Sequence, residues 1–158
     1  MFGPNLRAMV LDGVVDPSLA FEDFLVGQAA AFEDTFARQA AQCAAAGEQA
    51  CGVPDLLAAY DAVSGMVEDS VQQSSAGPVG PSELATAAAA VGYRAGGWEA
   101  IGAALEDALR GDHSGIRMLA DGYRSLVAYG PYAGVVCTDS QRPEGFEEFR
   151  AFEALSLI

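Results

Sequence analysis

The sequence carries few of the side chains that act as nucleophiles or general bases in hydrolytic enzymes. Its single histidine is His113, which follows Asp112. Two serines are weighed as nucleophiles: Ser64 in A-V-S-G-M and Ser114 in D-H-S-G-I. Serine hydrolases commonly place the nucleophile in a G-x-S-x-G turn between a strand and a helix, and this pentapeptide is absent. Ser64 falls within a helical pattern, and a lone histidine at a helix start is usually exposed and idle. The residues alone therefore predict no catalytic triad.

Metal and phosphate sites have equally little support. One histidine and three dispersed cysteines give none of the spacings of a zinc site. The glycines of G-P-V-G-P (77–81) are followed by no lysine, and the prolines lack the backbone N–H that would bind phosphate. Aspartate and glutamate total 22, but no spacing selects an acid/base pair among them. We expect no metal and no cofactor, and an enzyme that uses carboxylates alone is a hypothesis without positive support.

Two of the three cysteines, Cys43 and Cys51, stand at one corner of a predicted helical hairpin. Cys43 comes near the end of a long helix and Cys51 just before the next, an arrangement that a disulfide can close. By the chain-entropy estimate, closing so short a loop stabilises the fold by about 2–3 kcal/mol. The alternative is two buried, reduced thiols. Cys137 then has no partner and is expected to be a free thiol.

Composition narrows the classes of partner. The 158 residues can bury a substantial core, and 8 basic against 22 acidic residues give a formal charge of −14. Such a field repels phosphate backbones and anionic lipid surfaces, so neither nucleic acid nor a membrane is an expected partner. The charge could attract cationic ligands or could simply maintain solubility. No apolar run is long enough for a membrane span. The N-terminus lacks the basic, apolar and cleavage regions expected of a signal peptide.

The apolar periodicity predicts a mainly α fold with about six helices. Asp16 and Pro17 are predicted to be the N-cap and first residue of the longest helix, which ends at Gly47. The apolar face of this helix carries Leu19, Phe21, Phe24, Leu25, Phe32 and Phe36. Further helices are predicted over 55–71, 81–92, 98–109, 114–130 and 144–157, with a loop over 73–81. Short strand-like segments, apolar or β-branched, lie near residues 7–15 and 133–139.

Three features together resemble one family: R-A-M-V-L-D-G-V-V-D-P-S-L (7–19), the long helix with its Cys43/Cys51 corner, and V-V-C-T-D-S-Q (135–141). They are similar to the middle of secreted bacterial α/β-hydrolases of the tripeptidyl-aminopeptidase type. The resemblance implies a core-strand remnant at 1–16, a helical cap (lid) domain at 17–132, and a return segment with a terminal helix at 133–158. It also implies that the catalytic triad and the partner of Cys137 lie outside this chain, which would be non-catalytic alone.

In the full enzymes that this chain resembles, the cap roofs the active site and helps to select short peptides by their free N-terminus. An α-ammonium group in a partly dry cleft needs a carboxylate partner. Asp139 is the first candidate for this contact, followed by Glu22 and Asp23. Each has a simpler alternative, because Asp139 could cap the turn before the last helix and the other two could interact with the helix dipole.

A second hypothesis from a different class is a helical module for protein interaction or self-assembly. The apolar segment at residues 8–11 would be an unpaired strand edge, so self-association through the N-terminal segment is expected under either hypothesis. The reading frames on either side of this segment in its source DNA would distinguish the cap hypothesis from the interaction-module hypothesis. A cap should be flanked by sequence for G-x-S-x-G upstream and for Asp and His downstream, whereas an interaction module should have its own start and stop.

Overall fold

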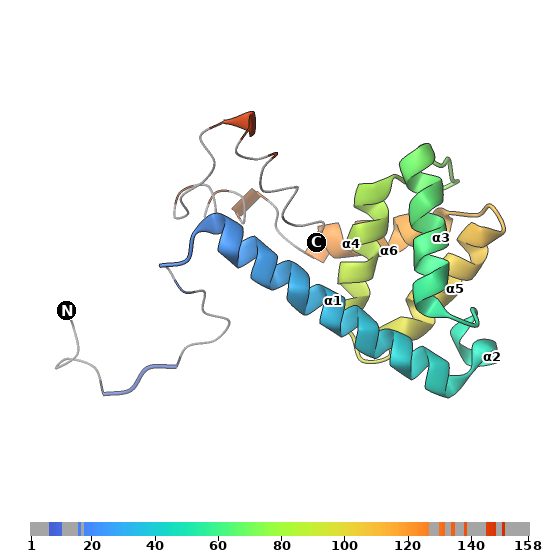
Figure 1. Ribbon diagram of the computed structural model, residues 1–158, viewed down its shortest axis with the longest axis horizontal. Helices are drawn as coiled ribbons and strands as arrows, with labels where there is room; N and C mark the ends of the chain where they lie inside the picture. Colours follow the sequence, from blue (N-terminus) through green and yellow to red (C-terminus); the bar gives the residue numbers. More distant parts are fainter. Residues whose placement is uncertain are drawn as a thin grey trace.

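The computed structural model describes residues 7–10, 16 and 18–126, together with 130, 131, 134, 138, 145–147 and 150. Within this part the chain is helical and contains no β-sheet (Figure 1). The helices, in chain order, are α1 (Phe21–Ala46), α2 (Glu48–Cys51), α3 (Leu56–Asp69), α4 (Pro81–Gly92), α5 (Gly97–Leu109) and α6 (Ser114–Leu126). The mainly α fold predicted from the sequence is confirmed.

Local signals in the sequence explain where most of these helices begin. Asp55 is the N-cap of α3, and its side chain accepts a hydrogen bond from the N–H of Ala58 at 3.1 Å. Pro81 is the first residue of α4, where its missing N–H is not needed. The loop before α4 is closed by an isolated antiparallel bridge between Gln72 and Val79. The helices predicted to start at residues 55, 81, 98 and 114 are confirmed, and each starts within one residue of the predicted position.

The start predicted for the long first helix is wrong by several residues. Helix α1 begins at Phe21, and its N-cap is Ala20, which offers no side-chain hydrogen bond. Asp16 instead accepts hydrogen bonds from both the backbone N–H and the hydroxyl of Ser18, at 2.9 and 2.7 Å. These two bonds also hold the pKa of the Asp16 carboxyl below its usual value. The aspartate therefore forms a local turn rather than a helix cap.

Two further expectations need correction. The loop expected between the first two long helices contains the single turn α2, which ends at the left-handed residue Gly52. The strand-like segments are not strands where they are described: residues 7–10 make no sheet pairing, and Gly134 and Thr138 are helical. A strand needs a neighbour to satisfy its backbone groups, whereas a helix satisfies its own. The terminal helix predicted at 144–157 lies mostly outside the described residues.

The core lies between α3, α4, α5 and α6, and the apolar positions that fill it recur every three or four residues. Helix α4 packs most extensively against α6, and α5 packs against both α3 and α6. Apart from Cys43 and Cys51, the largest fully buried side chains are Leu56, Val63, Val67, Val79, Leu84, Val91, Ile101, Leu105 and Ile116. These four helices form a compact bundle to which the C-terminal half of α1 is attached.

Helix α5 makes close backbone contacts with two neighbouring elements, and a glycine of α5 lies at each contact. A Cβ atom added to Gly102 would lie 2.0 Å from the carbonyl oxygen of Cys51, and one added to Gly97 would lie 2.2 Å from the carbonyl oxygen of Val91. Both distances are far below van der Waals contact. The absence of side chains at these two positions therefore lets α5 pack directly onto the backbone of α2 and of the C-terminal turn of α4.

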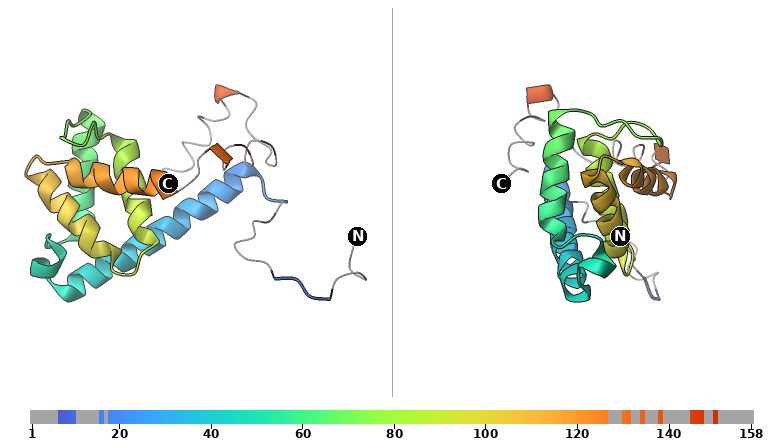
Figure 2. Two further views of the ribbon diagram at one scale, coloured as in Figure 1. Left: turned by 180° about the vertical axis from the view of Figure 1, so that it is seen from behind. Right: turned by 90° about the vertical axis from the view of Figure 1, so that its right-hand side faces the viewer.

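The N-terminal half of α1 extends beyond the bundle, as the views from the front and from behind both show (Figures 1 and 2). From Glu22 onward, the first buried residue along this helix is Gln39, and Phe24 and Leu25 before it are half-buried. Phe36 packs against the edge of the core, whereas Val26 is exposed. Between Glu22 and Gln39, the apolar side chains of the longest helix are thus only partly covered.

Candidate functional site

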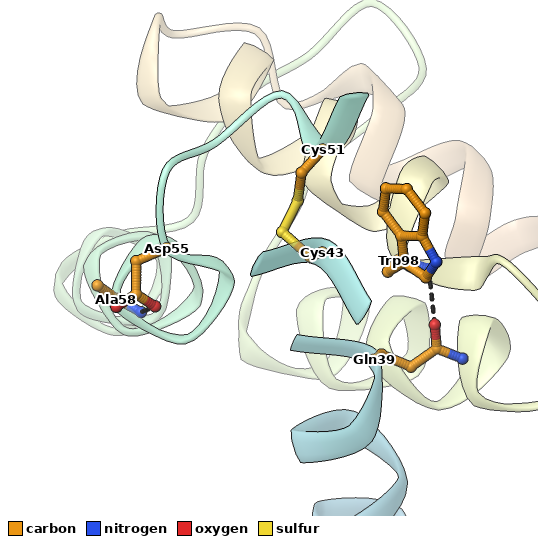
Figure 3. Close-up of a disulfide and its surroundings, with 6 residues drawn as sticks. All are labelled: Gln39, Cys43, Cys51, Asp55, Ala58 and Trp98. Atoms are coloured by element: carbon orange, nitrogen blue, oxygen red, sulfur yellow. Dashed lines mark hydrogen bonds between the residues drawn. A yellow bond between two sulfur atoms is a disulfide. The ribbon is translucent and has the colours of Figure 1, made fainter. Parts of the chain in front are cut away.

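A disulfide fixes the corner at which α1 turns back towards the bundle. Cys43 and Cys51 are both buried, with Cα atoms 5.2 Å apart, and their sulfur atoms are bonded (Figure 3). The bond joins the last turns of α1 to α2, against which Gly102 of α5 packs. The disulfide predicted from the spacing is confirmed, and the alternative of two reduced thiols does not hold in this structure.

One turn before this corner, Gln39 connects α1 to the turn between α4 and α5. Its side chain is only 7% exposed. The side-chain amide oxygen accepts a hydrogen bond from the backbone N–H of Trp98 at 2.8 Å (Figure 3). The side-chain NH₂ group donates to the carbonyl oxygen of Arg94 at 3.2 Å. Gln39 therefore sets the position of the short segment after α4, including Tyr93 and Arg94.

Three aromatic rings form a row across α1, the end of α4, and α6. The ring of Tyr93 meets Phe32 edge-on with a centroid distance of 5.8 Å, and stacks on Tyr123 at 5.8 Å with an interplanar angle of 22°. These are favourable aromatic geometries. Tyr93 is nevertheless 66% exposed, so the centre of the row is a surface that a ligand or a neighbouring domain can contact.

Two hollows lie on either side of Tyr93. One, of about 300 Å³, is lined by Gln28, Ala31, Phe32, Thr35, Gly92 and Tyr93. The other, of about 440 Å³, is lined by Ala90, Tyr93, Arg94, Tyr123 and Leu126. Volumes in this range suit small ligands or single side chains. The aromatic row with these two hollows is the candidate functional site of the described chain.

Of the acidic residues predicted to contact substrate, Glu22 and Asp23 line neither hollow. Glu22 and Asp23 lie in the first turn of α1, where the helix dipole favours acidic side chains. Glu22 is half-buried and Asp23 is exposed. Asp139 and Cys137 lie outside the described residues. The substrate role of the three acids therefore stays a prediction, as does the free thiol.

The described residues hold no group of three or more His, Cys, Asp or Glu side chains that could bind a metal ion. None of their helices combines the length and apolarity of a membrane span. Ser64 lies in α3, where its hydroxyl donates to Glu68 at 3.0 Å. Ser114 opens α6, as predicted, and its N–H donates to Asp112 at 2.9 Å.

The expectation that His113 is exposed is wrong. The side chain is only 4% exposed, and neither ring nitrogen has a hydrogen-bond partner within the described part of the chain. His113 follows the turn between α5 and α6, in which Gly111 has φ +98°. Burial of a polar ring without a partner costs free energy, so we expect His113 to lower the stability of the fold.

We expect His113→Leu to raise the free energy of unfolding by about 1 kcal/mol, because a buried polar group without a partner is replaced by an apolar one. Urea denaturation at pH 7 measures the change. The matched variant is Gln39→Leu, which removes a buried polar side chain that does have partners and should lower stability by about 1–3 kcal/mol. A loss of stability in both variants would contradict the assignment for His113.

An ion pair joins α4 to α6. Oε1 of Glu83 is 3.0 Å from Nη2 of Arg124, and its Oε2 accepts a hydrogen bond from the N–H of Gly80 at 3.0 Å. The hydrogen bond from Gly80 and, to a lesser degree, Arg124 hold the pKa of Glu83 below its usual value of 4.5. Glu83 is thus stabilised in its charged form by the folded state.

This lowered pKa predicts an acid-dependent contribution to stability. Because the pKa is lower in the folded than in the unfolded chain, the contribution is complete above pH 4.5 and is lost as the pH falls through the folded value. Glu83→Gln should lower the free energy of unfolding by up to about 1 kcal/mol at pH 7 and by less at pH 3. Glu99→Gln, in the first turn of α5, is the control. An effect of Glu83→Gln that is equal at both pH values would contradict the prediction.

Sequence comparison relates the chain to part of larger hydrolases. It is 30% identical over 155 aligned positions to a protein named carboxylesterase B in Mycobacterium tuberculosis, and to the same degree to a Mycobacterium bovis protein named as a hydrolase. The alignment covers 90% of this chain but only 29% of either relative. The chain therefore spans less than a third of the length of the curated relatives it matches. No protein-family model and no solved structure matches it.

Proposed function

We propose that this chain is the cap region of a larger α/β-hydrolase and that it roofs the active site of that enzyme. The observation that carries the proposal is the alignment, in which nearly all of this chain corresponds to a minor part of proteins named as hydrolases. A mainly helical chain fits an insertion that covers a catalytic domain, since its described residues form no sheet of their own.

The apolar surface that the bundle leaves uncovered supports this role. Between Glu22 and Glu33, the first half of α1 contains no fully buried residue, and Val26 is exposed there. The hollows beside Tyr93 are lined from this half of α1 and from the end of α6 at Leu126. A cap needs such a surface, because its inner side must face both the catalytic domain and the substrate.

The finer part of the proposal concerns substrate and location. We assign to the full enzyme a tripeptidyl-aminopeptidase specificity, in which Asp139, Glu22 or Asp23 binds the α-ammonium group of a short peptide. The chain alone would be non-catalytic, because the serine, the acid and the histidine would come from the rest of the enzyme. The disulfide between Cys43 and Cys51 supports a secreted location, since such bonds persist in oxidising compartments.

An activity assay on the purified chain tests the non-catalytic role. We expect no turnover above buffer of chromogenic acyl esters or of tripeptide substrates, and no labelling by a serine-directed inhibitor. A full-length M. tuberculosis carboxylesterase B serves as the positive control for the ester substrates. Turnover by the chain that the inhibitor abolishes would reveal a nucleophile within it and would remove the cap proposal.

A second candidate function is self-association through the N-terminal segment. Val10 is 91% and Met9 62% exposed, so this apolar segment has no partner within the described chain. We expect the whole chain to sediment as a dimer or larger species, and a variant without residues 1–16 to sediment as a monomer. A monomeric whole chain would exclude this function.

A further inference from the structure

We propose that the larger hollow beside Tyr93 binds a carboxylate carried on an aromatic or branched apolar body. The hollow of about 440 Å³ lies between the end of α4 and the end of α6. It is built from residues of the described chain alone. The proposal therefore does not depend on the hydrolase role, and the two can fail separately.

The apolar half of the ligand would be recognised by the stacked tyrosines. Tyr93 and Tyr123 stack on each other and line the hollow together with Ala90 and Leu126. Tyr93 and Leu126 are largely exposed, at 66% and 75%. An aromatic ring or a branched chain placed here would cover these side chains and would meet the tyrosine faces or edges in favourable geometry.

The charge of the ligand is inferred from Arg94. Residues 18–126 contain five arginines, and four of them form ion pairs with carboxylates, namely Arg38, Arg110, Arg117 and Arg124. Arg94 lines the hollow and has no carboxylate partner among the described residues. A guanidinium is a preferred partner of carboxylates because its N–H groups match the two oxygens. An arginine that has no carboxylate partner among the described residues and lies beside an apolar hollow is best matched by a ligand with one negative charge.

The test is an NMR titration of the ¹⁵N-labelled chain with 3-phenylpropionate, with 3-phenylpropanamide as the neutral analogue. We expect saturable shifts of the amide signals of Tyr93, Arg94 and Tyr123. The amide should bind about tenfold more weakly, and Arg94→Gln should weaken binding of the carboxylate by a similar factor. Arg94 is exposed and only its backbone carbonyl is used by Gln39, so this variant should fold normally.

Arg110→Gln is the matched control, because it makes the same change in net charge at the opposite end of α5, where Arg110 pairs with Glu106. It should change binding by less than about twofold. Tyr93→Ala should remove binding of the carboxylate through loss of the ring. The proposal is overturned if no saturable shift occurs, if the amide binds as tightly as the carboxylate, or if Arg94→Gln and Arg110→Gln have equal effects.

Discussion

Gly102→Ala is expected to be among the most destabilising single substitutions in this chain. The new methyl group would lie 2.0 Å from the carbonyl oxygen of Cys51 and 3.0 Å from its sulfur. Because the first contact is with backbone, α5 has to move away from α2, and the buried side chains on either side of Gly102 lose their packing. We expect a loss of about 3 kcal/mol or more in the free energy of unfolding, measured by urea denaturation.

Gly27→Ala is the control for this prediction. Gly27 lies within α1, and nothing lies within 4 Å of a Cβ atom added there. The same substitution should stabilise the chain by about 0.5–1 kcal/mol, because alanine is the better helix former. If Gly102→Ala were neutral or stabilising as well, the close approach of α5 to Cys51 would not exist in solution.

Removing the disulfide is expected to have the second large effect. The bond between Cys43 and Cys51 closes a loop with a sequence separation of 8, and its loss should lower the free energy of unfolding by about 2–3 kcal/mol. Both the double variant Cys43→Ala/Cys51→Ala and the chemically reduced wild type should show this loss in thermal denaturation. The variant and the reduced protein should agree, since both remove the same constraint from the unfolded chain.

Cys137→Ser is the control and should leave stability unchanged. In a thiol assay on the unfolded chain, the wild type should give one reactive thiol without reductant and three after reduction. Three thiols without reductant would show that the disulfide does not form. An unchanged melting temperature in the reduced protein would contradict its expected contribution to stability.

The helices that the sequence predicts correctly are those with a strong local signal. Asp55 caps α3 and Pro81 opens α4, and each acts through backbone groups within a few residues. Asp16 carries a similar signal, but its carboxylate bonds to Ser18 instead, and α1 begins later at Phe21. The choice between a turn and a cap depends on the conformation of the next few residues, so the residue types at positions 16 and 17 do not decide it.

The candidate site was missed because it depends on contacts between distant parts of the chain. Gly-Tyr-Arg occurs twice, at 92–94 and 122–124, and this repeated tripeptide was the available signal. The two tyrosines meet only because α4 packs against α6. The two arginines differ for the same reason: Arg124 pairs with Glu83, whereas Arg94 has no such partner among the described residues. The burial of His113 likewise depends on how the turn before α6 folds.

The cap role can be tested directly by exchange with a relative. In M. tuberculosis carboxylesterase B, the region aligned with this chain is either deleted or replaced by it, and kcat/KM is measured for a chromogenic ester and a tripeptide substrate. Formation of the bond between Cys43 and Cys51, checked by mass spectrometry, shows that the inserted chain has folded. We predict that the exchanged enzyme is active and prefers the tripeptide more strongly than the parent enzyme does. A folded insert whose enzyme has the same substrate ratio as the deletion variant would contradict the account.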